Sequence, residues 1–466
     1  MSDPTDPKST YAIIGGGISG LSAAFYLQKK FPEAAITVYE SSERLGGVLK
    51  TVRNGNFLVE ASADMFVTQP RSAIELCRDL GIEAQLLQTQ PVDDRAFIGL
   101  GKKIFPVPQG LSMMVPTIPQ PILESALLSD EGKARFLAED EIDAVTTDQD
   151  ESLKSFAVRR FGIEAYEKII QPMVSGIYTA DPEKLSMHAT MQRFVDMERE
   201  HGSLITALKN NRNKGDAQAS GARYGMFRTP TNGMETLVTS IVNALPRVEF
   251  KTNTMVSTIA PKHSPAKGVG WNVDKQFYNG IVLATPAAAS ATMIVETDPK
   301  LANALSGIST ASSAIVVMGV SRESLKTNFR GYGIIYPHVD DGQVIALSFS
   351  SNKFAGRCGD EEVLIRCFIG GALQSELVDL KDEELLEIAI AQLEQSVGFK
   401  GEPLFTDVFR WKQCMPQYHL GHLDRVKEIE QRVEPHQGLE IAGNSYWGVG
   451  IPACIASGKS AAERLV

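Results

Sequence analysis

The chain has 466 residues, which is enough to bury a large core and to divide into two or three units. Its 43% hydrophobic and 22% charged residues are typical of a globular protein, and its net charge of −10 excludes a general affinity for nucleic acid. Five cysteines without a CxxC spacing favour reduced thiols in a cytosolic compartment, and the polar first ten residues predict no secretory signal.

A glycine-rich turn follows the first predicted strand, residues 11–14. Gly15 permits a tight turn, and Gly17 has no side chain to keep a pyrophosphate from the backbone. Gly20 lets the next helix pack closely on the strand, and the N-terminal amides of that helix would face the phosphates. The turn therefore indicates a nucleotide-binding βαβ unit.

The next predicted strand, residues 35–39, ends in Glu40, about 20 residues beyond the last glycine. This is where a dinucleotide-binding fold needs an acceptor for a ribose hydroxyl. Glu40 begins an E-x-x-x-R-x-G-G arrangement with Arg44, Gly46 and Gly47, which offers a guanidinium for phosphate and a bare backbone for a flat ring system. Directly after a dinucleotide fingerprint, the arrangement resembles the FAD-binding signature of the flavin amine oxidase superfamily.

The following residues predict a β-hairpin over 51–60, with Asn54-Gly55 as its turn, and a helix over 72–80 that Gly81 ends. Residues 104–125 are largely uncharged, but five prolines forbid a continuous spanning helix. A buried or cleft-lining loop and a peripheral contact with a bilayer both stay open for this segment.

Charged, helical sequence over 129–161 presents four apolar residues on one face, and Gly162 ends it. Residues 209–222 are polar and low in complexity, which predicts a solvated loop. Several β-type segments and one amphipathic helix, marked by Leu386, Ile390, Leu393 and Val397, complete the middle of the chain. The β-type segments are 248–250, 255–259, 281–284, and the closely spaced 314–320, 332–336, 344–350 and 363–369, which predict an antiparallel sheet.

The C-terminus predicts a strand over 439–442 and then a second glycine motif, formed by Gly448, Gly450 and Ala453, before a helix of small residues. No second strand or acid follows, so this cannot be a second nucleotide fold. We expect the helix to aim its N-terminal amides at the oxygen-rich edge of an isoalloxazine ring.

Five stretches together resemble the oxygen-dependent protoporphyrinogen/coproporphyrinogen oxidases of haem biosynthesis, in particular their Bacillus-like branch. They are the N-terminal fingerprint, GIYTADPEKLS at 176–186, FRTPTNGMETLV at 227–238, RWKQCMPQYHLGH at 410–422 and GVGIPACIAS at 448–457. The resemblance covers essentially the whole chain. Gln69-Pro70 stand where a basic pair is common in the family, which leaves Arg71 as the candidate contact for a propionate.

The resemblance implies an α/β fold with a Rossmann-type FAD-binding domain, an antiparallel-sheet substrate domain and a helical domain that in some relatives touches membrane. Three sets of residues follow from it, and the FAD-binding set is discontinuous. They are 1–66, 223–292 and 405–466 for FAD; 67–85, 177–222 and 293–404 for substrate; and 86–176 for the helical, membrane-binding-like domain.

By position, the resemblance also implies the site. Gly176, Ile177 and Tyr178 would lie at the reacting face of the flavin and position the substrate there. The residues expected to bind FAD are Gly15, Gly17, Ile18, Ser19, Gly20, Glu40, Ser41, Arg44, Leu45, Gly46, Gly47, Val48, Val256, Trp411, Gly443, Gly450, Ile451 and Pro452.

The implied reaction is the six-electron oxidation of a porphyrinogen to a porphyrin with dioxygen as acceptor and hydrogen peroxide as product. Coproporphyrinogen III and protoporphyrinogen IX both stay open as substrates. Hydride would leave a methylene flanked by electron-rich pyrroles for flavin N5, so the substrate stabilises its own cation and no nucleophile or triad is expected. The expected setting is cytoplasmic, with peripheral membrane contact and the choice between monomer and homodimer left open.

Two histidines, one tryptophan and two arginines are further candidates for roles at the site. His419 and His422 have an H-x-x-H spacing without an evident third ligand, so no metal site is expected. Trp411 is either a core residue or a flavin contact, and Arg223 and Arg228 are either solvated or contacts for a carboxylate.

Two other functions stay open. A general flavin amine oxidase would share the FAD motifs but needs an aromatic cage, of which Tyr446-Trp447 is the one hint. A non-enzymatic escort of lipidated GTPases would keep the fold without flavin, and the intact Arg44, Gly46 and Gly47 disfavour it.

Overall fold

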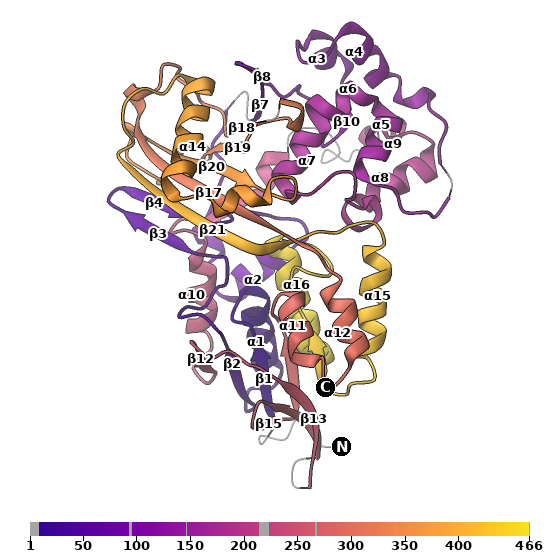
Figure 1. Ribbon diagram of the computed structural model, residues 1–466, viewed down its shortest axis with the longest axis vertical. Coiled ribbons are helices and arrows are strands. Elements are labelled where there is room, and N and C mark those ends of the chain that lie inside the picture. The colour runs from indigo at the N-terminus through magenta and orange to yellow at the C-terminus, as the bar shows by residue number, and fades with distance from the viewer. Residues whose placement is uncertain are drawn as a thin grey trace.

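The structure is a computed structural model that describes residues 9–92, 96–145, 147–213, 223–265, 268–340 and 342–465, without the side chains of 211–213, 223 and 224. Its described residues form a parallel sheet with flanking helices in the lower half of Figure 1. A larger, mainly antiparallel sheet and a helical region lie side by side above it.

The lower sheet is parallel and has the strand order β12-β2-β1-β16-β22. Its strands are β1 (Thr10–Ile14), β2 (Ala35–Tyr39), β12 (Glu249–Lys251), β16 (Gly280–Leu283) and β22 (Leu439–Ile441). The order of strand, helix and strand expected at the N-terminus is confirmed, with α1 (Ile18–Lys30) between β1 and β2. Parallel strands end at one edge, so the glycine turn, Glu40 and the segment after β22 share that edge.

Each face of the parallel sheet has its own core, because successive side chains in a strand point to opposite faces. Ile13 faces a core shared with α1 and three further helices, whereas Ile14 faces the other core. The helices of the first core are α2 (Ser72–Asp79), α10 (Glu235–Asn243) and α16 (Ile451–Arg464). The elements of the second core are β13 (Ile259–Ser264), β14 (Gly268–Val273), β15 (Gln276–Tyr278), α11 (Ala287–Ile294), α12 (Pro299–Ser306) and α15 (His422–Val433).

The upper sheet has seven strands in the order β21-β17-β20-β19-β18-β7-β8. They are β7 (Ala96–Leu100), β8 (Lys103–Pro106), β17 (Thr310–Ser321), β18 (Gly333–Ile335), β19 (Val344–Phe349), β20 (Glu362–Gly370) and β21 (Phe405–Pro416). The antiparallel pairing expected for the closely spaced strands is confirmed, and the pair β18 and β7 is parallel. One face packs against α14 (Asp382–Val397), and the hairpin of β3 (Thr51–Asn54) and β4 (Phe57–Glu60) packs on part of the other.

The helical region has a separate core, built from residues of 98–208 and Tyr418. Its helices are α3 (Pro119–Glu124), α4 (Asp130–Leu137), α5 (Leu153–Phe161), α6 (Ile163–Ala165), the π-helix Tyr166–Ile170, α7 (Gln171–Tyr178), α8 (Met187–His201) and α9 (Leu204–Asn213). The four apolar residues expected on one face of α5 are buried, and Gly162 ends this helix as expected.

The remaining elements are short. They are β5 (Phe66–Val67), β6 (Leu86–Gln88), β9 (Leu111–Ser112), β10 (Val115–Pro116), β11 (Phe227–Pro230), α13 (Ser350–Lys353) and the 3-10 helices Glu83–Gln85, Glu139–Glu141, Arg223–Met226, Arg322–Ser324, His338–Asp340 and Ser375–Asp379. Within the largely uncharged segment 104–125, the side chains of Met114, Val115 and Ile122 are buried in the helical region. Among the described residues, no helix combines the length and the apolar character needed to cross a membrane.

Four local expectations were wrong. The helical sequence expected over 129–161 is interrupted, because residues 142–145 and 147–152 are not helical. Residues 255–258 form no strand, because the amides of Ser257 and Thr258 donate to the Asp274 carboxylate instead of a neighbouring strand. Residues 209–213 are helical, because they continue α9 beyond its buried Leu204 and Leu208, while 214–222 lie outside the described residues. The hairpin turn lies one residue later than expected, since residues 54 and 57 pair across it.

The boundaries of the three expected domains stay a prediction. Among the described residues, three strands pair outside the set to which they were assigned. One is β6, which was expected with the helical residues and pairs with β11 of the FAD-binding set. β21 was expected with the FAD-binding residues and pairs with β17, and β7 was expected with the helical residues and pairs with β18. Strand pairing joins segments that are distant in sequence, and no local pattern reports it.

Candidate active site

The turn between β1 and α1 can be built only with glycine at two of its positions. Gly15 has φ +110°, and a Cβ there would lie 2.5 Å from the carbonyl oxygen of Ala284. A Cβ on Gly20 would lie 1.9 Å from the carbonyl oxygen of Gly15. These contacts bring the start of α1, with Ile18 and Ser19, against the edge of the sheet.

Gly17 differs from the two packing glycines, because a Cβ at Gly17 would meet no protein atom within 4 Å. The loop of residues 44–48 borders the same space. Its Gly46 amide donates to the Gly16 carbonyl oxygen at 2.8 Å, and a Cβ on Gly47 would lie 3.2 Å from the Gly17 Cα. Bare backbone on two sides of an open space fits the pyrophosphate expected there.

Glu40 directly follows β2, as expected, and its carboxylate accepts hydrogen bonds from the protein itself. It accepts from the Gly16 amide at 2.9 Å and from the amide and hydroxyl of Ser42 at 2.8 Å each. Ser41 is exposed beside it. The Thr254 amide donates to the Glu40 carbonyl oxygen at 2.9 Å, which brings the segment with the buried Val256 to this edge.

Arg44 makes contacts that the sequence did not indicate. Its guanidinium donates to the carbonyl oxygens of Leu45 at 3.1 Å and Leu49 at 2.9 Å, and also to that of Gly47. The side chain therefore holds the shape of the loop that carries Gly46, Gly47 and Val48.

The C-terminal glycine segment lies at the same edge, after β22. The Gly443 amide donates to the Ser457 hydroxyl of α16 at 2.7 Å. Gly450 caps α16, whose first residues are Ile451 and Pro452. The Ser72 hydroxyl donates to the Pro452 carbonyl oxygen at 2.5 Å, so Arg71, exposed at the start of α2, lies beside the N-terminus of α16.

Tyr418 and His422 fix the loop that leads into α16, and the sequence reasoning missed this role. The Tyr418 hydroxyl accepts from the Gly448 amide at 2.8 Å and donates to the Asn444 carbonyl oxygen at 2.6 Å. His422 stacks on Tyr418 with ring centroids 3.9 Å apart, and burial lowers its pKa. Among the described residues no group of three His, Cys, Asp or Glu side chains could hold a metal ion.

Trp411 extends from the upper sheet toward the loop of residues 44–48, which we call the flavin loop. Its indole nitrogen donates to the Ala61 carbonyl oxygen at 2.7 Å, and the adjacent Ser62 hydroxyl donates to the Val48 carbonyl oxygen at 2.6 Å.

The Arg228 guanidinium donates to the nearby carbonyl oxygens of Gly225 and Phe227 at 2.7 and 2.8 Å. The side chain of Arg223 lies outside the described residues.

The helix α7 carries the three residues expected at the flavin face. Gly176 is exposed, and the Ile177 side chain keeps 46% of its surface exposed. The Tyr178 hydroxyl donates to the Thr190 carbonyl oxygen at 3.3 Å, and burial raises its pKa.

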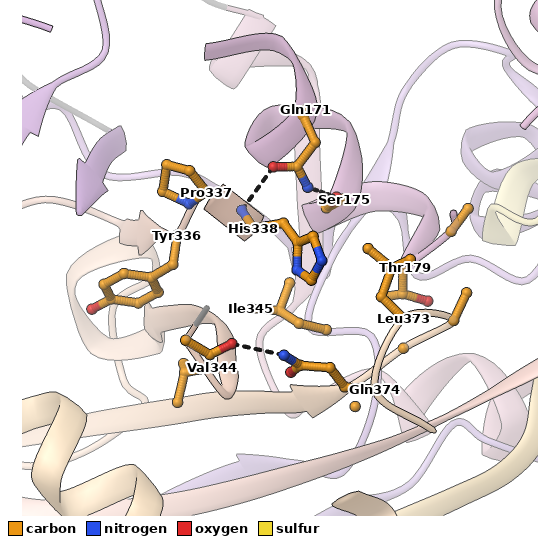
Figure 2. A pocket seen from close by; sticks show the side chains of 15 residues that line it. Gln171, Ser175, Thr179, Tyr336, Pro337, His338, Val344, Ile345, Leu373 and Gln374 are labelled. Atoms are coloured by element: carbon orange, nitrogen blue, oxygen red, sulfur yellow. Dashed lines mark hydrogen bonds between the residues drawn. The ribbon is translucent and has the colours of Figure 1, made fainter. Parts of the chain in front are cut away.

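Figure 2 shows a cavity beside α7, to whose lining Gln171, Ser175 and Thr179 contribute at helical spacing. Gln171 accepts from the His338 amide at 2.9 Å and donates to the Ser175 hydroxyl at 2.6 Å, and the His338 ring faces the cavity. These contacts fix α7 against the loop after β18.

Comparison with known proteins agrees with this geometry. The family model for flavin containing amine oxidoreductases matches residues 18–466. The chain is 33% identical to a coproporphyrinogen III oxidase of Bacillus subtilis and 30% identical to one of Staphylococcus aureus, in each case over 98% of both chains. A crystal structure of a protein from Exiguobacterium sp. 255-15 superposes with a TM-score of 0.85 at 26% identity, over 98% of both chains.

The chain belongs to the flavin-containing amine oxidoreductase family. The resemblance and the Rossmann-type α/β fold expected from the sequence are confirmed. FAD is its cofactor, and the open space at Gly17 and Gly47, the acid at the end of β2 and the N-terminus of α16 fit that group. The contacts of the individual residues with FAD stay a prediction.

Proposed function

We propose that this chain is an FAD-dependent oxidase that converts a porphyrinogen to the porphyrin, with coproporphyrinogen III as the preferred substrate. The observation that carries the proposal is the full-length similarity to two bacterial coproporphyrinogen III oxidases, at 33% and 30% identity. The reaction consumes three dioxygen molecules and releases three hydrogen peroxide molecules for each porphyrin, which balances the six electrons and six hydrogens removed.

Bound FAD supplies the hydride acceptor and returns the electrons to dioxygen. The protein has to position the substrate and keep it in one orientation. The exposed Gly176 and Ile177 of α7 would flank the macrocycle, and a Cβ built on Gly176 lies 3.7 Å from the Ile335 side chain of the upper sheet. A Cβ at Gly176 would therefore make an ordinary van der Waals contact with this sheet.

The carboxylates of the substrate need cations, because the protein as a whole carries a charge of −10 and does not attract anions by its overall field. Arg71, exposed beside the N-terminus of α16, is the candidate that the sequence pointed to. In its role as a propionate contact, Arg71→Ala should lower kcat/KM for coproporphyrinogen III more than for protoporphyrinogen IX.

One experiment tests the proposed function against both alternatives. Purified protein should carry flavin absorbance, which an escort protein without flavin would lack. Addition of coproporphyrinogen III under air should produce porphyrin fluorescence at a rate proportional to enzyme. A yellow protein that oxidises neither porphyrinogen but oxidises primary amines would overturn the proposal in favour of a general amine oxidase.

A further inference from the structure

A buried charged cluster lies on the upper sheet, outside the site described above. It consists of Asp64, Ser348, Ser350, Lys353 and Arg366, and we call it the inner-face cluster. Arg366 lies on β20, opposite Ser348 of β19. Its neighbours Ile365 and Cys367 point to the opposite face, which α14 covers, so Arg366 points toward the segment that follows β4.

The cluster carries one positive charge in excess. The Asp64 carboxylate lies 2.8 Å from the Lys353 ammonium and 3.1 Å from the Arg366 guanidinium, so one carboxylate faces two cations. Although burial alone would raise it, these two cations hold the pKa of Asp64 well below its usual range.

The next ionisable pair does not remove the excess. Arg357 donates to the Thr229 hydroxyl and to two backbone carbonyl oxygens, and the Glu60 carboxyl accepts from the Met234 amide and the Thr51 hydroxyl. Even with Glu60 ionised, these two charges cancel each other and leave the inner-face cluster at plus one. A buried charge without a counterion is costly.

Three polar groups of the cluster also lack hydrogen-bond partners. They are the Nε of Arg366 and the hydroxyls of Ser348 and Ser350. The three residues are 1%, 7% and 3% exposed. Buried polar groups are normally paired, and leaving one unpaired costs about 1 to 3 kcal/mol. Unpaired donors beside an excess cation match what a carboxylate ligand requires.

The cluster lies between the two parts of the candidate active site. On one side, Arg366 donates to the Ser62 carbonyl oxygen, and the Ser62 hydroxyl donates to the carbonyl oxygen of Val48 in the flavin loop. On the other side, the same sheet face continues from Ser348 to β18, where Ile335 meets Gly176 of α7. A substrate held between the flavin loop and α7 would therefore lie over this face.

We propose that the inner-face cluster is a carboxylate-binding site, in which Lys353, Arg366 and the Ser348 hydroxyl take one propionate of the substrate while Asp64 holds the two cations in place. The proposal rests on the proposed function and adds a substrate contact to it. Asp64 acts as a positioning residue, because it reaches the ligand only through its partners.

Equilibrium binding of coproporphyrin III to the holoenzyme tests the proposal, with its tetramethyl ester as a ligand that lacks the carboxylates. Lys353→Met removes the excess charge but leaves Asp64 paired with Arg366, so the protein should fold and retain FAD. We expect coproporphyrin III to bind about 10- to 100-fold more weakly, with the binding of the ester unchanged. Ser348→Ala, which removes an unpaired hydroxyl, should give a weaker effect of the same kind.

The matched control is Lys412→Met, which makes the same charge change at an exposed lysine paired with Asp379 and should bind both porphyrins as the wild type does. Equal weakening for the acid and the ester would overturn the proposal, because it would indicate a packing defect. The proposal would also be overturned if Lys353→Met shifted the flavin reduction potential and left porphyrin binding unchanged. That result would indicate that the excess positive charge acts on the flavin and not on the substrate. A wild type that oxidises no porphyrinogen refutes the proposed function, whereas wild-type binding by both cluster variants refutes only this site.

Discussion

At the scale of single residues, the glycines of the first turn have separable roles. Gly15 and Gly20 pack against backbone, whereas Gly17 borders only open space. We therefore expect the first two to be required for folding and the third for binding the cofactor. The fingerprint in the sequence treats all three alike, and their surroundings distinguish them.

Gly17→Val should yield a folded protein without FAD, because a Cβ at this position meets no protein atom within 4 Å and the side chain enters the space expected for the pyrophosphate. Far-UV circular dichroism should match that of the wild-type apoprotein, and flavin absorbance should be absent after desalting. A folded variant with its full complement of FAD would show that the cofactor does not pass Gly17.

Glu40→Gln should weaken FAD binding by about 1.5 to 3 kcal/mol, because a neutral acceptor replaces the carboxylate expected to bind the ribose hydroxyls. The same change also weakens the bond from the Gly16 amide, which shapes the turn. Flavin dissociation constants, measured by fluorescence during dialysis, check the prediction. Glu43→Gln is the control, since Glu43 is an exposed acid three residues away, and equal retention of FAD by both variants would contradict the assignment.

At the scale of elements, α16 is held against α1 by close backbone contact. A Cβ on Gly458 would lie 2.1 Å from the Ser19 carbonyl oxygen, so small residues in this helix allow its approach. The position of α16 then sets the position of its N-terminus at the edge of the parallel sheet. Tyr418, before α15, and His422, its first residue, fix the loop between β22 and α16.

The end of β4 carries a buried acid that should make stability depend on pH. Burial raises the pKa of Glu60 to about 7 from 4.5, although the Met234 amide, the Thr51 hydroxyl and two arginines oppose it. Between these two values the folded protein binds a proton that the unfolded chain has lost. Stability from this group is therefore full below about pH 4.5 and is lost as the pH rises through 7, by about 3 kcal/mol in total.

Glu60→Gln should remove this pH-dependent contribution to the free energy of unfolding. Urea unfolding at pH 5 and pH 8 should show the wild type losing about 3 kcal/mol more than the variant across that interval. The control variant Glu43→Gln, at an exposed position, should keep the wild-type loss. Identical pH profiles for wild type and Glu60→Gln would show that Glu60 is ionised throughout the folded state.

At the scale of the whole molecule, the described residues form one parallel sheet of the dinucleotide-binding kind, in which the acid Glu40 follows β2. The C-terminal glycine segment lies at the same edge of this sheet. The described residues contain no second dinucleotide-binding unit of this kind for a nicotinamide cofactor. Coproporphyrinogen III should therefore be oxidised under air without NAD or NADP, with about three peroxide molecules per porphyrin. Peroxide and porphyrin are measured together, and a reaction that requires added NAD or NADP would contradict this expectation.

The local parts of the fold and site could be predicted because their signals are short in sequence. The first 31 consecutive residues of the fingerprint contain a strand, a glycine turn, a helix and a second strand that ends in Glu40. Local φ, ψ and packing constraints determine each of these elements. The resemblance extended this to the whole chain and to FAD. The 255–258 and 209–213 errors arose where the Asp274 side chain and the packing of α9 outweighed local propensity.

The sequence by itself determined the N-terminal part of the dinucleotide edge, because the consecutive residues 10–40 build it. Only the tertiary structure decided which charges meet. Asp64 lies 289 residues before Lys353 and further still before Arg366, and the three residues carry no shared spacing. The pairing of β19 with β20 and the course of the chain after β4 bring them together. Likewise, Tyr418 and His422 could be assigned to the loop before α16 only once α15 was placed beside it, since hydrogen bonds and ring stacking act over a few ångströms of space.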